Sequence, residues 1–191
     1  MDVTIKGRAA SDRPETETRT EAETRTETGA EAGHWLELSR HFAAPRALVF
    51  AAFAQTRHLR RWCCPAGFTV TRAEGDFREG GAWTSAMTGP DGTLHRMAGA
   101  YLEIEPGRLI RQSHAWIEAD GSRGPERRIE IRLADEAAGT RLRFRMGPFE
   151  TEANRDGHGA GWSQCLDHLE GLLPGLLAED ADPPEDPRSG G

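Results

Sequence analysis

Hydrophobic and polar residues alternate along several short segments of the chain, a pattern that predicts β-strands. The clearest case is residues 140–147, TRLRFRMG, where Leu142, Phe144 and Met146 alternate with arginines. Residues 127–135, RRIEIRLAD, repeat the pattern just before it. Because successive side chains of a strand point to opposite faces, this pair should present one apolar and one charged face. Further strands are predicted at 34–42, 68–77, 82–89, 94–105 and 108–118.

Turn residues separate these segments closely, as Pro90-Asp91-Gly92 does between two of them. Connections of hairpin length join neighbouring strands in opposite directions. The sequence therefore predicts a mainly antiparallel sheet of seven strands.

Three segments follow a helical pattern instead. Pro45 opens a short helix with an apolar stripe, and residues 56–62 form a second one. The third helix is long, from about 151 to 177, and its large side chains recur at steps of three and four residues. Such a helix must lie on an apolar surface, and one face of the sheet is the candidate. The expected fold class is therefore α+β, in the order strand, two short helices, six strands and a long helix.

A straight helix does not fill a twisted, curved sheet, so a cavity between the two is a physical expectation. Gly157, Gly159 and Gly161 weaken the first turns of the long helix. Because they lack side chains, they also let a ligand or another backbone approach closely.

Charge and composition divide the chain into a central domain, 34–177, and two acidic tails, 1–33 and 178–191. The first tail has five basic and eight acidic residues and a repeated ETRTE pattern without large apolar side chains, and the second has one basic and five acidic residues and several prolines. We expect both tails to be disordered. Since the whole chain carries −7, the central domain is neutral and offers no net field to attract nucleic acid.

Other features of composition exclude further classes of protein. No apolar run approaches the ~20 residues of a membrane span, and the first residues lack the apolar stretch of a secretory signal. Three cysteines are too few for a disulfide framework and fit the cytoplasm, where we expect the protein to be located. The only lysine is Lys6, so the central domain lacks a lysine for Schiff-base or phosphate-loop chemistry.

Motifs spread over the central domain resemble a known family. They include Phe42-Ala43-Ala44-Pro45-Arg46 with Val49-Phe50, His58-Leu59, Arg61-Trp62, Pro65-Ala66-Gly67-Phe68, Gly80-Gly81-Ala82-Trp83, Gly89-Pro90-Asp91-Gly92, Gly99, Tyr101, Pro106, Arg108-Leu109, Gly139-Thr140 and Gly161-Trp162. In order and spacing they resemble the START-like, helix-grip superfamily, and within it the activator-of-heat-shock-protein-90-ATPase-like (AHSA-type) family.

The resemblance implies a curved seven-stranded sheet that grips the C-terminal helix around a hydrophobic cavity. The chain departs from the usual pattern at Cys63 and Cys64, at Ser85, and at Arg111 and Gln112. These departures predict a wider or more polar cavity than is typical of the family.

Candidate ligand-binding residues are the large or polar side chains that we expect to face this cavity. Trp83 and Ser85 share one strand face, as do Met97 and Tyr101, with Gly99 between them leaving room. His158 is placed to donate a hydrogen bond to a polar ligand at the cavity mouth. The full set is Trp83, Ser85, Met97, Tyr101, His114, Trp116, His158, Trp162 and Cys165.

We expect the function to be non-catalytic binding of a hydrophobic or aromatic small molecule. One alternative is a chaperone-associated interaction protein. Another is an enzyme similar to polyketide cyclases or aromatases, with Glu103, His114 or His158 as acid or base. Cys63 and Cys64 are adjacent and point apart in an extended segment, which is poor geometry for joint metal ligation, so we expect no metal and no cofactor.

Overall fold

The structure is a computed structural model that describes residues 33–181. Of the expected tails, 1–33 and 178–191, residues 1–32 and 182–191 lie outside the described residues. The long helix, Glu152–Ala181, continues four residues beyond the boundary expected from the sequence, so residues 178–181 are helical and do not belong to a tail.

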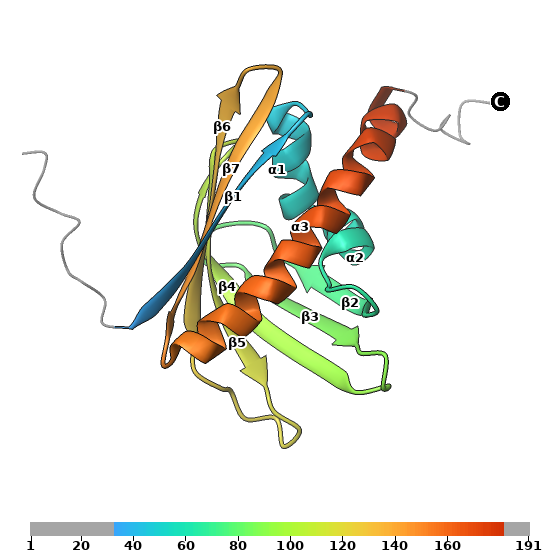
Figure 1. Cartoon of the computed structure of the whole chain (residues 1–191). Coiled ribbons are helices and arrows are strands. Elements are labelled where there is room, and N and C mark those ends of the chain that lie inside the picture. The colour runs from blue at the N-terminus through green and yellow to red at the C-terminus, as the bar shows by residue number, and fades with distance from the viewer. Residues whose placement is uncertain (1–32, 182–191) are drawn as a thin grey trace, which may run out of the picture. The chain divides into compact units, whose positions relative to one another are not determined.

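Within the described chain, seven strands form one antiparallel sheet in the order β1-β7-β6-β5-β4-β3-β2 (Figure 1). The elements run β1 His34–Phe42, α1 Arg46–Ala54, α2 Thr56–Trp62, β2 Thr69–Gly75, β3 Ala82–Thr88, β4 Leu94–Glu105, β5 Leu109–Ile117, β6 Arg127–Glu136, β7 Gly139–Phe149 and α3 Glu152–Ala181. Each strand pairs with its neighbour in the chain except β1, which pairs with β7. The helix-grip fold predicted from the sequence is confirmed.

The helices lie on one side of the curved sheet. The long helix α3 crosses this face diagonally and packs against β1 and β7, while α1 and α2 lie beside its C-terminal half (Figure 1). As the alternation predicts, Leu142, Phe144 and Met146 of β7 are buried under the helices. The arginines between them lie on the opposite face of the sheet.

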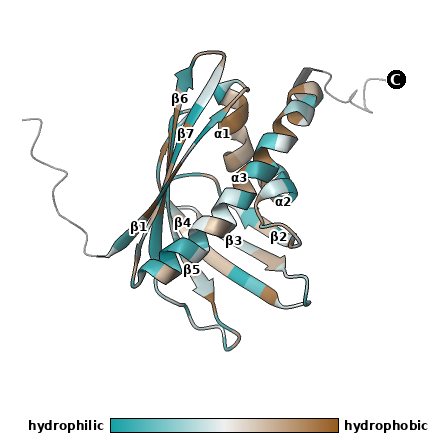
Figure 2. Cartoon of the chain, viewed as in Figure 1, coloured by the Kyte–Doolittle hydropathy of each residue, from teal (hydrophilic) through white to brown (hydrophobic). Residues whose placement is uncertain are grey.

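The two halves of α3 differ in character. In its C-terminal half Leu166, Leu169, Leu173 and Leu176 are almost completely buried. Figure 2 shows hydrophobic residues along this half and hydrophilic ones in the first turns. The core is therefore centred where the C-terminal half of α3 meets α1 and the β1–β7–β6 side of the sheet.

Candidate functional site

A cavity of about 380 Å³ lies between the N-terminal half of α3, strands β3 to β5, and the segment that follows α2. Aromatic and sulfur-containing side chains dominate its walls. Its lining consists of Cys63, Pro65, Met87, Met97, His114, Trp116, Ala153, Asn154, Gly157, His158, Gly161, Trp162 and Cys165.

A smaller space of about 70 Å³, which we call the inner chamber, adjoins this cavity on the side of α1 and α2. The two spaces share Cys63, Met97, His114 and Trp162 as walls. Further walls of the chamber come from α1, α2 and strands β2 to β6, and include Phe53, Leu59, Trp62, Trp83, Ser85, Tyr101, Gln112, Ile129 and Ile131.

The structure brings together all nine residues that the sequence predicted to face the cavity. Six line the outer cavity, and Trp83, Ser85 and Tyr101 line the inner chamber. The sequence prediction missed Cys63 and Pro65, which a loop delivers to the cavity, and it missed Ala153 and Asn154 in the first turn of α3.

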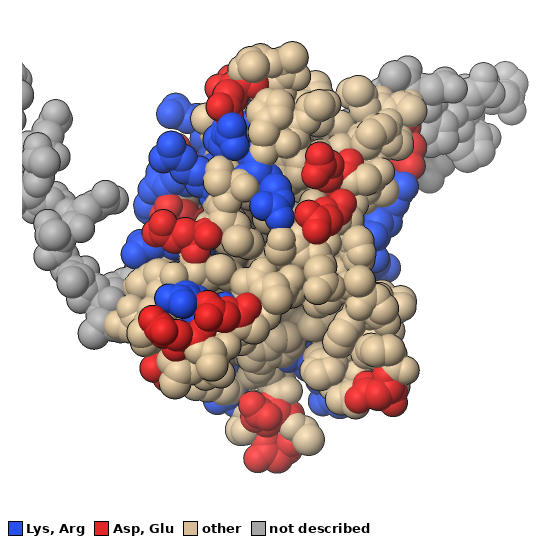
Figure 3. Space-filling model, in the orientation of Figure 1, with Lys and Arg blue, Asp and Glu red and all other residues tan. Residues whose placement is uncertain are grey.

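The cavity mouth has no charged lining residue in the described chain. In the space-filling view, the surface between the N-terminal half of α3 and strands β3 to β5 is mainly uncharged, with acidic side chains at the outlying loops (Figure 3). Around the inner chamber the one charged lining residue is Glu74, an exposed carboxylate 2.7 Å from the guanidinium of Arg72.

His158 at the mouth is held by two hydrogen bonds. Its Nδ1 lies 2.8 Å from the carbonyl oxygen of Asn154, one helical turn earlier, and the indole Nε1 of Trp116 donates to its Nε2 at 3.3 Å. These bonds fix the neutral tautomer with the proton on Nδ1. His158 therefore has no donor left for a ligand in this arrangement, contrary to the role expected from the sequence.

A row of aromatic rings leads from the mouth to the inner chamber. The ring centroids of His158 and Trp116 are 6.3 Å apart, those of Trp116 and His114 are 5.4 Å apart, and those of His114 and Trp83 are 5.9 Å apart. Flat rings in this row offer faces and edges against which an aromatic ligand can stack.

Burial sets the protonation states of His114 and Tyr101, which line the inner chamber. It lowers the pKa of His114 to about 4, with smaller contributions from His158 and Arg127, so the ring is neutral at neutral pH. Burial also raises the pKa of Tyr101 to about 12, with a smaller contribution from Cys63, so the phenol keeps its proton.

The thiols beside the cavity are protonated as well. Burial raises the pKa of Cys63 to about 12, with a smaller effect of Cys64, and it also raises the pKa of Cys165. A thiol that stays protonated is a weak nucleophile and a poor metal ligand. In residues 33–181, no group of three or more His, Cys, Asp or Glu side chains is placed to hold a metal ion.

Gly99 does not leave open room, contrary to the sequence prediction. A Cβ at this position would lie 2.7 Å from Nε1 of Trp83 and 1.9 Å from the carbonyl oxygen of Ser113. The glycine is thus needed because the Ser113 carbonyl of β5 and the indole of Trp83, its cross-strand neighbour, both come too close to this position for a side chain.

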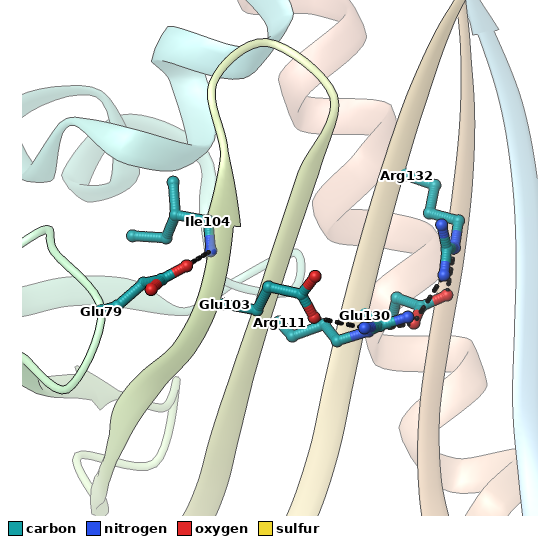
Figure 4. A network of polar contacts seen from close by, with 6 residues as sticks. All are labelled: Glu79, Glu103, Ile104, Arg111, Glu130 and Arg132. Carbon is teal, nitrogen blue, oxygen red and sulfur yellow. Dashed lines mark hydrogen bonds and ion pairs between the residues drawn. The ribbon is translucent and has the colours of Figure 1, made fainter. Parts of the chain in front are cut away.

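Arg111 and Glu103 also differ from the sequence predictions, because both lie on the outer face of the sheet (Figure 4). Arg111 donates to Glu130 at 2.6 Å and to Glu103, while Arg132 donates to Glu130 at 2.5 Å. Neighbouring Gln112 lines the inner chamber as predicted. Glu103 is therefore not available as an acid or base in the cavity, and Arg111 does not make the cavity polar.

Close to this network, Glu79 accepts a hydrogen bond from the backbone nitrogen of Ile104 at 3.0 Å (Figure 4).

No helix in the described part of the chain is long and apolar enough to cross a membrane.

Comparison with known protein families and solved structures identifies relatives of this chain. The family described as "Activator of Hsp90 ATPase homolog 1-like protein" matches residues 43–174. No curated protein matches the sequence.

Solved bacterial structures share the fold. A protein from Chromobacterium violaceum is 29% identical, with a TM-score of 0.67, over 73% of this chain and 96% of that one. A protein from Silicibacter pomeroyi is 25% identical, with a TM-score of 0.67, over 74% and 98%. A protein from Nitrosomonas europaea is 24% identical, with a TM-score of 0.66, over 78% and 99%, and shows the common fold alone.

Proposed function

The chain belongs to the family of activator of Hsp90 ATPase homolog 1-like proteins, and we propose that it binds a hydrophobic or aromatic small molecule in the cavity between the sheet and α3. The observation that carries this proposal is the cavity itself. Its volume of about 380 Å³ is in the range of small-molecule sites. Its walls are aromatic, aliphatic and thioether groups, which gain free energy when a ligand removes them from water.

The construction of α3 supports the same proposal. Gly157 and Gly161 line the cavity, and a Cβ added at position 157 would meet nothing within 4 Å. Glycine inside a helix costs roughly 1 kcal/mol relative to alanine. Gly157 therefore leaves space open beside the cavity at the expense of helix stability, while a Cβ at Gly161 would meet Pro65 at 3.6 Å.

The test uses phenylnaphthylamine, a neutral probe that fluoresces strongly only in apolar surroundings. We expect it to brighten with the wild-type protein in a saturable manner. In Gly157→Leu the new side chain would occupy the cavity mouth, so binding should weaken by about tenfold or more.

The matched control is Gly171→Leu, a substitution on the same helix at an exposed glycine that also has open space around its Cβ. It should leave probe binding unchanged. Equal binding by both variants would refute the assignment of the site to this cavity.

A second candidate function, assistance to a chaperone, is favoured by the printed description of the family. The outer face of β5 to β7 would be the contact surface, because it presents arginines and glutamates in place of apolar side chains (Figure 4). The test is the rate of ATP hydrolysis by a purified Hsp90-type chaperone with and without this protein. An unchanged rate would leave ligand binding as the function.

A further inference from the structure

The indole of Trp116, on β5, is tied to the long helix by a histidine. Trp116 and His158 both line the outer cavity, and both are partly exposed, so each keeps surface that water or a ligand can reach. The Trp116 indole donates to Nε2 of His158 at 3.3 Å, which joins β5 to α3. On the other side of the imidazole, Nδ1 bonds to the carbonyl oxygen of Asn154 at 2.8 Å. These two hydrogen bonds fix the orientation of the indole relative to the helix.

The hydrogen bond between β5 and α3 requires a neutral imidazole at His158. Neutral imidazole has one donor nitrogen and one acceptor nitrogen, and here the acceptor faces the indole N–H. A proton added to Nε2 makes both nitrogens donors, while an indole N–H can only donate. Because two donors then face each other, protonation of His158 must break its hydrogen bond with Trp116.

The groups around His158 keep it neutral at neutral pH. Burial lowers its pKa from the ordinary 6.5, and the positive charge of Arg127 on β6 acts in the same direction, whereas the Asn154 carbonyl and Glu150 oppose the shift. Arg127 and Glu150 are themselves paired at 3.0 Å. His114 on β5 also lines the cavity, but burial lowers its pKa to about 4. Between pH 7.5 and 5, His158 is therefore the lining group of the outer cavity whose charge changes.

A hydrophobic ligand in the outer cavity favours the neutral state of His158 further. The ligand displaces water from the cavity wall, and an imidazolium that loses its water without gaining a carboxylate is costly. No carboxylate of the described chain lines this cavity. Once its hydrogen bond is lost, the Trp116 indole must also be ordered again when a ligand stacks on it. Ligand binding and protonation of His158 thus oppose each other, so the affinity is highest at neutral pH and falls as the pH drops below 6.5.

We propose that His158 positions Trp116 as a wall for the ligand and that protonation of His158 ends this positioning, so that the cavity holds its ligand at neutral pH and releases it in acid. This inference rests on the proposed function, because it concerns the regulation of the same site. His158 is a positioning residue here, since it acts through Trp116 and its own donor is already used by Asn154.

The first measurement needs no ligand. The indole N–H proton of Trp116 gives an NMR signal that is assigned by its loss in Trp116→Phe. We expect this signal to move upfield as the pH falls from 7.5 to 5, because a proton that leaves a hydrogen bond is more shielded. His158→Gln supplies an amide oxygen as acceptor and does not titrate, so its signal should stay in place. In His158→Ala the signal should already lie upfield at pH 7.5.

The second measurement is the affinity for phenylnaphthylamine, which stays neutral over the same pH range. In the wild-type protein it should fall about threefold or more between pH 7.5 and 5. His158→Gln should bind the probe as tightly as the wild type at pH 7.5 and should keep that affinity at pH 5.

His95→Gln is the matched control. The imidazole of His95 also lies beside Trp116, with ring centroids 6.2 Å apart, but it lines neither cavity. The indole N–H of Trp116 is directed to His158 instead. This variant should therefore keep both the movement of the Trp116 signal and the fall in affinity with pH.

The outcomes distinguish the two proposals. If phenylnaphthylamine does not bind the wild-type protein at pH 7.5, the binding function fails and the regulation that rests on it fails too. If the probe binds but its affinity follows the same pH curve in the wild type and in His158→Gln, the binding function stands and the role of His158 is overturned. A wild-type Trp116 signal that does not move with pH would overturn that role as well.

Discussion

The two halves of α3 lie against different parts of the same sheet. The C-terminal half inserts Leu166, Leu169, Leu173 and Leu176 into the core, each with at most 3% of its surface exposed. The N-terminal half places glycines, His158 and a half-buried tryptophan beside the cavity. We refer to these as the closed and the open region of the interface between α3 and the sheet.

Buried polar groups show the same difference. Around the closed region, Thr140 donates to the carbonyl of Ala44 at 2.7 Å. In the wall of the inner chamber, the Trp62 indole is also paired and donates to the carbonyl of Ala52 at 3.1 Å. In the open region, Trp83 and His114 each retain a nitrogen without a partner. The closed region therefore supplies stability, while the open region retains unfilled volume and two buried nitrogen atoms without a partner.

The largest expected difference between the regions is the effect of truncating an apolar side chain. Leu169→Ala removes a completely buried side chain from the closed region and should lower the free energy of unfolding by about 3 kcal/mol. Met97→Ala removes a partly buried side chain that already borders open space in both cavities. It should cost only about 1 kcal/mol, because little new cavity is created.

Urea denaturation of the two variants beside the wild type measures both losses. Probe binding supplies the complementary measurement, because Met97→Ala should alter the affinity for phenylnaphthylamine and Leu169→Ala should not. Comparable losses of stability would mean that the open region is packed as tightly as the closed one.

Acid should weaken the open region through His114. Burial lowers the pKa of its imidazole from the ordinary 6.5 to about 4, so the unfolded chain takes up a proton before the folded one does. The contribution is therefore complete above pH 6.5 and is lost as the pH falls toward 4. Between pH 7 and 4.5 we expect a loss of about 2 kcal/mol, which His114→Gln should largely lack.

Other titrating groups must be separated from this effect. His158 on α3 lines the same cavity as His114 and also has a pKa lowered by burial, while the positive charges of Arg127 and Arg123 contribute to the lowered pKa of His114. Since His158 and the surface carboxylates are present in both proteins, the difference between the two stability curves isolates His114. Parallel curves would mean that His114 is solvated in the folded protein.

The sequence predicts the closed region more completely than the open one. Leu142, Phe144 and Met146 alternate so regularly that their buried face follows from the period of a strand. The inward orientation of His114 and Trp116, in contrast, depends on the register of β5, which the pattern of that strand leaves open.

The remaining features of the site depend on tertiary contacts. The loop after α2 brings Cys63 to the same cavities that Trp162 and Met97 line, a placement that no local sequence pattern encodes. Likewise, that Gly99 accommodates the Trp83 indole becomes evident only once β3 and β4 are paired. Neither of the two unpartnered nitrogen atoms could be recognised before their surroundings were known.

The smallest expected difference concerns the indole N–H groups of Trp62 and Trp83. Both rings are buried, and replacement by phenylalanine removes the same atoms from each. Trp62→Phe also breaks the hydrogen bond to Ala52, whereas Trp83→Phe removes a donor that has no partner in the described chain. In the ligand-free protein Trp62→Phe should therefore cost about 1 kcal/mol more than Trp83→Phe, a gap that paired urea denaturation curves resolve. Equal losses would mean that the Trp83 nitrogen already has a hydrogen-bond partner in the folded protein.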